Sequence, residues 1–170
     1  SEFIGYDNLE ADVRIARYRR VKTKNNVTYQ LVFDHTPFYG NSGGQIGDIG
    51  YIESANEKIE IVATEKENGL IIHIAKRLPE NPTAEFRAVV DANARQQAAN
   101  NHTATHLVDY ALRTVLGTHV EQKGSMVTPQ GLRFDFSHFQ KVTTDEIREV
   151  ERLVNRLVRA NYPLVENREA

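Results

Sequence analysis

The stretch FRAVVDANARQQAAN, residues 86–100, marks the point at which the chain changes from one kind of secondary structure to another. Before Asp91, apolar residues recur at every second position, as in residues 27–33, which is the period of a half-buried β-strand. After Asp91 the spacing of apolar residues is helical, and Asp91 itself is a suitable N-cap. Strands and helices that occupy separate segments predict an α+β fold.

The first ninety residues contain six short stretches with strand period, separated by turn residues. We expect strands over residues 12–21, 27–33, 50–52, 58–64, 70–75 and 86–90. Asn68-Gly69 is the dipeptide most typical of a two-residue β-hairpin turn. Strands of this length and spacing predict a small β-barrel or sandwich. We therefore assign residues 1–90 to a β-barrel domain and residues 91–170 to a second, α+β domain.

The second domain is expected to begin with a helix over residues 92–116 that stops at Gly117. Asn100-Asn101 leaves open a division of this segment into two helices. A β-hairpin is expected over residues 120–136. A capping box at residues 143–146 then begins an amphipathic helix that ends near Asn161, and residues 164–170 are expected to begin another strand.

Composition excludes several classes of protein. The 170 residues are 40% hydrophobic, with a net charge of −2 and a pI near 6.3, so the chain is not a general polycation. The absence of cysteine excludes a disulfide framework and fits a reducing cytoplasm, where we expect the protein to be located. The sequence has no apolar run long enough to span a membrane. Because Ser1 is not a native start, we expect the chain to be a piece of a longer protein.

The sequence NHTATHL, residues 101–107, places two histidines four positions apart in the predicted helix. His102 and His106 therefore lie one turn apart on one face, where two imidazoles can bind the same divalent metal. Zinc takes four ligands in a structural site, and three with an open position in a catalytic site. The remaining ligands would be histidines, carboxylates or residues outside this sequence. A histidine pair at this spacing also occurs as a structural or coincidental feature of a helix.

Three further segments contain residues suited to binding. Residues 36–48, TPFYGNSGGQIGD, contain four glycines, and exposed N–H groups there can hold a phosphate or a carboxylate, unless the segment is only a barrel loop. Residues 119–125, HVEQKGS, would direct alternate side chains of a strand toward one site. The basic run RYRRVKTK, residues 17–24, is either a solvated strand face or a contact with RNA.

Four segments of the chain together resemble the editing region of the alanyl-tRNA synthetases. They are SGGQ at residues 42–45, NHTATHL at 101–107, HVEQKGS at 119–125 and LRFDFSH at 132–138, in the order and spacing of that family. The resemblance covers essentially the whole chain. Free-standing proteins that hydrolyse misacylated alanine tRNA, and the editing domain of threonyl-tRNA synthetase, share the histidine motif more loosely. Residues 3–7, FIGYD, resemble the entry into this region from the synthetase body, which favours a complete synthetase.

The resemblance implies a fold, an activity and partners. The implied fold is a small β-barrel followed by the α+β editing domain known as the second additional domain of threonyl- and alanyl-tRNA synthetases, of which residues 91–170 would be the N-terminal part. The implied activity is hydrolysis of seryl- or glycyl-tRNA(Ala) by an ATP-binding alanine–tRNA ligase. The implied partners are the acceptor end of tRNA(Ala) and the remainder of the synthetase chain, without a membrane.

The resemblance also assigns roles to residues at matching positions. His102 and His106 match zinc ligands, while Thr105 and Gln122 match pocket positions that influence editing and the choice of amino acid, so we predict these two as catalytic residues. The predicted substrate-binding residues match a segment near the editing pocket and are Ser42, Gly43, Gly44 and Gln45.

The chain departs from the family at one important place. The family's other zinc ligands are a cysteine and a histidine in a later Cys-x-x-x-His segment, which this sequence does not contain. We therefore expect an incomplete zinc site, and weak zinc binding and weak deacylation by this chain alone. His119 and His138 lie downstream of the pair but not at the family's ligand spacing. Gly40-Asn41 also replaces the more usual alanine-glutamate pair.

The expected chemistry follows from the reaction. Ester hydrolysis needs a positioned water and stabilisation of an oxyanion, and zinc can either activate the water or anchor the substrate's amino group. Thr105 or Gln122 can favour a serine hydroxyl, because alanine would leave such a polar group unpaired. The alternative interpretations are a free-standing editing protein, or a structural or tRNA-positioning module in which the histidines are inert.

Overall fold

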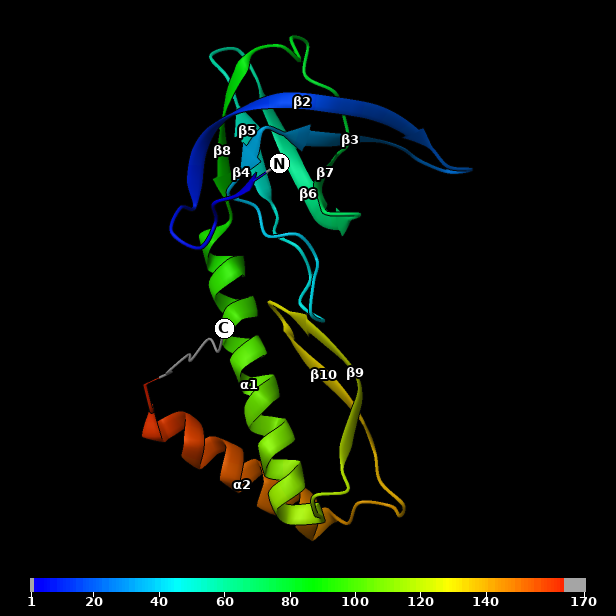
Figure 1. The fold of residues 1–170 in the computed structure, drawn as a ribbon, viewed down its shortest axis with the longest axis vertical. Coiled ribbons are helices and arrows are strands. Elements are labelled where there is room, and N and C mark those ends of the chain that lie inside the picture. Colours follow the sequence, from blue (N-terminus) through cyan, green and yellow to red (C-terminus); the bar gives the residue numbers. More distant parts are fainter. Residues whose placement is uncertain (1, 164–170) are drawn as a thin grey trace. The chain divides into compact units, whose positions relative to one another are not determined.

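The computed structural model describes residues 2–163 (Figure 1), so the strand expected at residues 164–170 lies outside the described residues. The chain divides into two compact units. The first comprises the residues up to Ala99 together with Thr128–Gln130, and the second comprises Asn100–Val127 and the residues from Gly131 onward. The domain boundary near residue 90 stays a prediction.

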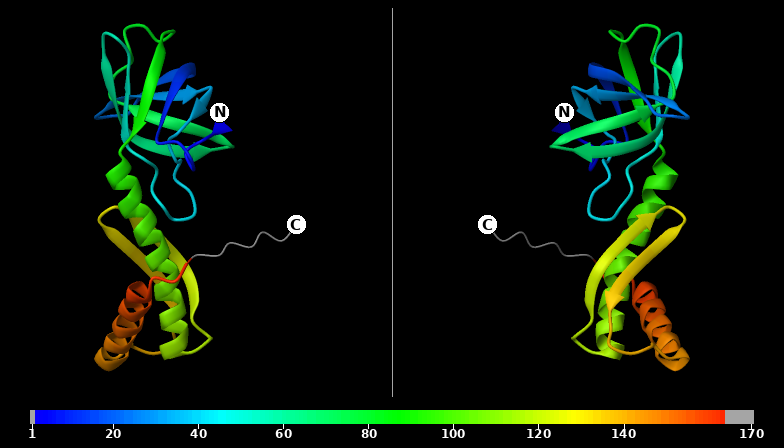
Figure 2. Two further views of the ribbon diagram at one scale, coloured as in Figure 1. Left: turned by 90° about the vertical axis from the view of Figure 1, so that its left-hand side faces the viewer. Right: turned by 90° about the vertical axis from the view of Figure 1, so that its right-hand side faces the viewer.

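The first unit is a closed, antiparallel β-barrel (Figures 1 and 2). Its strands follow one another around the barrel in the order β2, β3, β7, β6, β5 and β8. Their bounds are Glu10–Lys22 for β2, Val27–Phe33 for β3, Gly50–Glu53 for β5, Lys58–Glu67 for β6, Leu70–Ala75 for β7 and Glu85–Val90 for β8. Closure removes the open edges that an isolated sheet would expose. The predicted α+β class with an N-terminal barrel is confirmed.

The barrel interior is filled by alternate side chains of its strands. The largest fully buried apolar residues include Leu31, Phe33, Ile52, Ile61 and Phe86. They come from every strand of the barrel except β2 and β7, which contribute Val13 and Ala75 to the same core. Successive side chains of each strand therefore point alternately into the barrel and toward the solvent, as the alternation in the sequence predicted.

Two short features accompany the barrel. The Asn68-Gly69 turn has positive φ at both residues, 49° and 78°, as a two-residue turn between β6 and β7 requires. Strands β1, Glu2–Phe3, and β4, His35–Thr36, pair in parallel. The sequence analysis did not predict this pair, because two residues are too few to show strand period.

Helix α1, Ala92–Leu116, begins in the first unit and ends in the second. The Asp91 carboxylate accepts a hydrogen bond from the N–H of Ala94 at 2.9 Å, so Asp91 is the N-cap that the sequence indicated. The helix continues without a break through Asn100-Asn101, so the division into two helices is wrong. It stops before Gly117, whose φ of 119° a side chain would rarely adopt.

The second unit contains the C-terminal part of α1, the hairpin of β9 (Glu121–Thr128) and β10 (Gly131–Ser137), and α2 (Thr144–Ala160). Thr143 and Glu146 form the predicted capping box, and Asn161 ends α2 in a left-handed conformation. No residue of α2 is buried among the described residues, although the helix is strongly amphipathic. No helix within residues 2–163 is long and apolar enough to cross a membrane.

Candidate functional site

The two predicted metal ligands lie side by side on α1. The ring centroids of His102 and His106 are 5.4 Å apart and the ring planes differ by 17°, so the imidazoles are stacked. This separation is about the rise of one helical turn. Burial lowers the pKa of His102, and the charge that His106 can carry lowers it further. Both effects favour the neutral imidazole, which is the form that binds a metal.

The histidine pair alone could supply at most two ligands of a metal ion. Zinc needs at least three protein ligands even in an open catalytic site. Among residues 2–163, no group of three or more histidine, aspartate or glutamate side chains is arranged to hold a metal. The assignment of His102 and His106 as zinc ligands stays a prediction.

His119 and His138, the other histidines of this half of the chain, pair with each other. Nε2 of His119 and Nδ1 of His138 are 2.7 Å apart and form a hydrogen bond. Either ring can be the donor, depending on its tautomer. The ring of Phe139 lies against both, with centroids at 4.5 and 4.9 Å. In the described part of the chain these histidines do not join the α1 pair in a metal-binding group.

The predicted catalytic residues occupy different elements of the second unit. Thr105 lies on α1, is 5% exposed, and donates its hydroxyl proton to the carbonyl of Asn101 at 2.9 Å. Its oxygen can still accept a hydrogen bond. Gln122 lies on β9, is exposed, and donates from Nε2 to Ser125 Oγ at 3.2 Å. No hydrogen bond joins Thr105 to Gln122 within residues 2–163, and their cooperation in one pocket stays a prediction.

The predicted substrate-binding residues form a tight turn in the first unit. The N–H of Ser42 donates to the carbonyl of Gln45 at 3.1 Å, and the N–H of Gln45 donates back at 3.0 Å. Gly43 and Gly44 between them have φ values of 60° and 81°, the pattern of a type I′ turn, which explains why both are glycine. Gln45 is 6% exposed, so this turn presents mainly glycine backbone to solvent. Its role in substrate binding stays a prediction.

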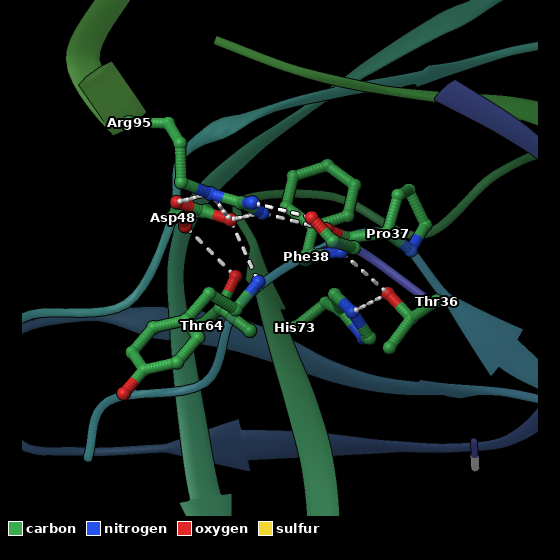
Figure 3. Close-up of polar contacts among 9 residues, drawn as sticks. Thr36, Pro37, Phe38, Asp48, Thr64, His73 and Arg95 are labelled. Carbon is green, nitrogen blue, oxygen red and sulfur yellow. Dashed lines mark hydrogen bonds and ion pairs between the residues drawn. The ribbon is translucent and has the colours of Figure 1, made fainter. Parts of the chain in front are cut away.

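A buried ion pair holds both ends of the glycine-rich segment to the start of α1 (Figure 3). Nε of Arg95 donates to the two carboxylate oxygens of Asp48 at 2.9 and 2.8 Å. The same guanidinium donates to the carbonyls of Gly5 and Pro37, each at 2.7 Å. Oδ2 of Asp48 also accepts from the N–H of Tyr39 at 2.7 Å. The path of the segment is therefore fixed by a network, not by the glycines alone.

Asp48 and Arg95 were not expected from the sequence to be partners. One feature pointed to them: Arg95 lies in the first turn of a helix, where a cation is opposed by the helix dipole. A basic residue at that place needs a compensating partner, and Asp48 ends the glycine-rich segment. Their side chains are 4% and 16% exposed, for Asp48 and Arg95 respectively, so the pair is positioned inside the protein.

A second buried polar group supports the same region of the barrel. His73 is fully buried, and its Nε2 lies 2.8 Å from Thr36 Oγ1 (Figure 3). Its Nδ1 lies 3.0 Å from the carbonyl of Leu31. A neutral ring satisfies both contacts if Nδ1–H donates to the carbonyl and Nε2 accepts from the hydroxyl. Burial lowers the pKa of His73 to about 4. This histidine is a structural residue of the barrel interior.

Comparison with known proteins assigns the class of the molecule. Residues 1–95 match the family profile described as tRNA synthetases class II (A). This segment includes the whole barrel and the glycine turn. The histidine helix and the β9–β10 hairpin lie almost entirely outside the matched residues, so their assignment rests on whole-chain relatives.

Those relatives are alanine–tRNA ligases. The chain is 60% identical to the ligase of Bacteroides fragilis over 168 residues, which is 99% of this chain and 19% of that protein. It is 60% identical to the ligase of Bacteroides thetaiotaomicron and 51% identical to the ligase of Porphyromonas gingivalis. Both matches cover 99% of this chain and 19% of the relative. The chain thus spans about a fifth of the length of these relatives. It belongs to the alanyl-tRNA synthetase family.

Proposed function

We propose that this segment acts in the complete ligase as the editing region, which hydrolyses the ester bond of seryl- or glycyl-tRNA(Ala). The observation that carries the proposal is the stacked pair of His102 and His106 on α1, 5.4 Å apart, with a buried threonine hydroxyl at position 105. A metal-binding pair beside a polar group is a typical setting for hydrolysis of an activated carbonyl. The tRNA(Ala) acceptor end and the rest of the synthetase are the corresponding partners.

Recognition of the amino acid is assigned to Thr105 and Gln122. The Thr105 hydroxyl donates its proton to the carbonyl of Asn101. The hydroxyl oxygen of Thr105 can therefore only accept a hydrogen bond from a ligand. It suits the hydroxyl of serine, which can donate. The side-chain carbonyl of Gln122 provides a second acceptor of the same kind. Alanine has no hydroxyl and would leave these groups unpaired, which costs binding energy and favours serine over the correct product; glycine, which also has no hydroxyl, is not selected by these two groups.

The glycine turn is proposed to contact the substrate through its backbone. Gly43 and Gly44 carry no side chain, so a sugar or phosphate group can approach their N–H groups closely. The Asp48–Arg95 network holds the segment in place and so reduces the entropy lost on binding. Arg95 and Asp48 act as positioning residues for this turn.

The test compares deacylation of seryl-tRNA(Ala) by this 170-residue chain and by the complete ligase, with zinc content measured for both. We expect stoichiometric zinc and rapid hydrolysis only for the complete ligase. In that protein, His102→Ala should abolish zinc binding and hydrolysis, and Gln122→Ala should chiefly change the ratio of seryl- to alanyl-tRNA hydrolysis. Arg148→Ala, which changes an exposed residue of α2, is the matched control. Unchanged hydrolysis in His102→Ala would contradict the proposal.

The second candidate is a module that positions tRNA without catalysis. It is favoured by one observation: the rings of His102 and His106 lie stacked on each other, with planes 17° apart, as in a pair that only packs. This alternative predicts that the complete ligase retains seryl-tRNA hydrolysis when His102, Thr105 and Gln122 are all replaced by alanine. The relatives compared above are complete ligases, so the free-standing alternative receives no support from them.

A further inference from the structure

The β2–β3 hairpin forms a basic arm, defined here as residues 16–30, whose residues 21–28 lie past the strands that close the barrel, since β3 pairs with β7 only through residues 29–31. Strand β2 pairs with β8 through residues 10–14, and from residue 17 it pairs with β3 alone. Residues 16–20 are all exposed, and Figure 1 shows the hairpin reaching away from the other strands of the barrel. An arm of this kind adds little to the barrel core, so its side chains are free to serve another purpose.

The arm concentrates positive charge in a chain whose net charge is −2. Residues 16–33 contain five basic residues and no acidic one, and the five are Arg17, Arg19, Arg20, Lys22 and Lys24. Within residues 2–163, only Arg19 among them lies within 4.0 Å of a carboxylate, that of Glu67. Both of those side chains are about two-thirds exposed, at 65% and 64%, so solvent screens the pair. The charge of the arm is therefore available to an anionic partner.

The surface beside these charges has the composition of a nucleic-acid contact. A groove of about 380 Å³ is lined by Arg17, Tyr18, Arg19 and Gln30 and by apolar side chains of β3 and β7, with Glu67 and Asn68 at the end of β6. Tyr18, between the two arginines, is 54% exposed. An exposed aromatic ring among cations can stack on a base while the cations bind phosphates.

We propose that the basic arm binds the phosphate backbone of RNA. The identity of that RNA as the tRNA presented for editing rests on the function proposed above. Charge complementarity suits any polyanion, but the hairpin turn, residues 23–26, is Thr-Lys-Asn-Asn and has no apolar side chain to enter a bilayer, while the exposed ring of Tyr18 can stack on a base, so RNA is favoured over an anionic membrane. Each lysine or arginine that contacts a phosphate releases condensed counterions, so the affinity should depend steeply on salt.

The test measures binding of the 170-residue chain to a tRNA(Ala) acceptor-stem minihelix by fluorescence anisotropy at several salt concentrations. The triple variant Arg17→Ala/Arg20→Ala/Lys22→Ala should weaken binding about tenfold or more at low salt, and should reduce the slope of log K against log salt by about 2 to 3. Tyr18→Ala should weaken binding without changing the slope, because stacking releases no counterions.

Two controls separate a local contact from a general effect of charge. The triple variant Lys66→Ala/Lys76→Ala/Lys141→Ala removes the same charge from exposed positions elsewhere and should leave the slope nearly unchanged. Replacing Arg17 and Arg20 by lysine should retain most of the affinity, since phosphate contact needs charge more than shape. Equal losses in both alanine triples would overturn the proposal. So would unchanged RNA binding with increased self-association in the arm variant, because charges on an edge strand also prevent pairing between chains.

The proposal can fail independently of the editing function. In the complete ligase, the arm variant should raise KM for deacylation of seryl-tRNA(Ala) and leave kcat unchanged. It should not affect hydrolysis of seryl-adenosine, which has no backbone phosphates. If the unchanged ligase does not hydrolyse seryl-tRNA(Ala), the editing function fails while the binding experiment still decides the role of the arm. Tighter binding to phosphatidylserine vesicles than to the minihelix would favour a membrane and contradict the proposal.

Discussion

The barrel and helix α2 use similar apolar residues in opposite ways. The barrel interior encloses the side chains of its core, and Phe33, Ile52 and Phe86 have no exposed surface. The apolar stripe of α2 is half-buried or exposed throughout, with Ile147 at 47% and Val158 at 54%. Apolar burial stabilises in proportion to the area removed from water. The stability of the described molecule therefore lies mainly in the barrel, while α2 keeps its helical form largely through local interactions.

The largest effect expected from this difference is that of Phe33→Ala in the barrel. Phe33 is fully buried and its ring stacks on His73 with centroids 4.0 Å apart. Its removal should cost about 4 kcal/mol of unfolding free energy, through lost apolar burial and the cavity left behind. Hydrogen exchange of the β3 and β7 amides, measured by mass spectrometry, should become faster as the free energy of unfolding falls. Ile147→Ala in α2 is the matched change and should cost less than about 1 kcal/mol. Equal costs would show that α2 is as tightly packed as the barrel.

The next effect concerns the ion pair between Asp48 and Arg95. Arg95→Ala leaves the Asp48 carboxylate buried at 4% exposure with no guanidinium partner. We expect a loss of about 3 kcal/mol, since the cost of an unpaired buried charge exceeds the net value of the pair. The N–H groups of residues 39–48 should then exchange faster, because the segment is no longer anchored to α1.

A second variant identifies the cause. Asp48→Asn/Arg95→Leu removes both charges and should recover part of the lost stability if the unpaired carboxylate is responsible. Arg14→Ala breaks an ion pair with Glu85 in which the side chains are 60% and 56% exposed, and it should cost less than about 1 kcal/mol. If the two single arginine variants are equally destabilised, burial of the Asp48 pair has no special effect.

Most of the fold could be predicted because period and turn chemistry are local properties of the sequence. The alternation in residues 27–33 and the Asn68-Gly69 turn placed β3 and the β6–β7 hairpin correctly. Asp91 and the Thr143 capping box placed the starts of both helices. The order of strands around the barrel was not predictable in the same way, because pairing between β2 and β8 depends on contacts about 75 residues apart in sequence.

In the candidate site, too, features set by neighbouring residues could be predicted, and contacts between residues far apart in sequence could not. Helical spacing alone predicted that His102 and His106 share one face, and the stacked rings agree with that spacing. Nothing in the spacing of Asp48 and Arg95 shows that they meet, because the chain between them forms four strands of the barrel. The family resemblance, confirmed by the relatives, supplied the candidate roles of Thr105 and Gln122, which their local environment does not determine.

A smaller effect is expected from the pH dependence of barrel stability. Burial holds the pKa of His73 at about 4, below the value of about 6.5 in an unfolded chain. The unfolded state therefore binds a proton first as the pH falls, so stability is lost between pH 6.5 and pH 4. From pH 8 to pH 5 the loss due to His73 should be about 2 kcal/mol. Urea unfolding at several pH values measures it, with His73→Gln as the comparison. An identical pH dependence in both proteins would show that His73 does not titrate in this way.

The smallest effect should come from the cap of α2, and it tests whether that helix depends on local interactions. The Thr143 hydroxyl accepts from the N–H of Glu146 at 3.2 Å, and the Glu146 carboxylate accepts from the N–H of Thr143 at 2.8 Å. Thr143→Ala removes the first bond and should cost about 1 kcal/mol, whereas Thr143→Ser should cost almost nothing because serine caps equally well. Since α2 buries no residue, this loss should increase hydrogen exchange along the helix and leave the barrel amides unchanged. Increased exchange in the barrel as well would mean that the two regions unfold together, and that α2 does not depend on local interactions alone.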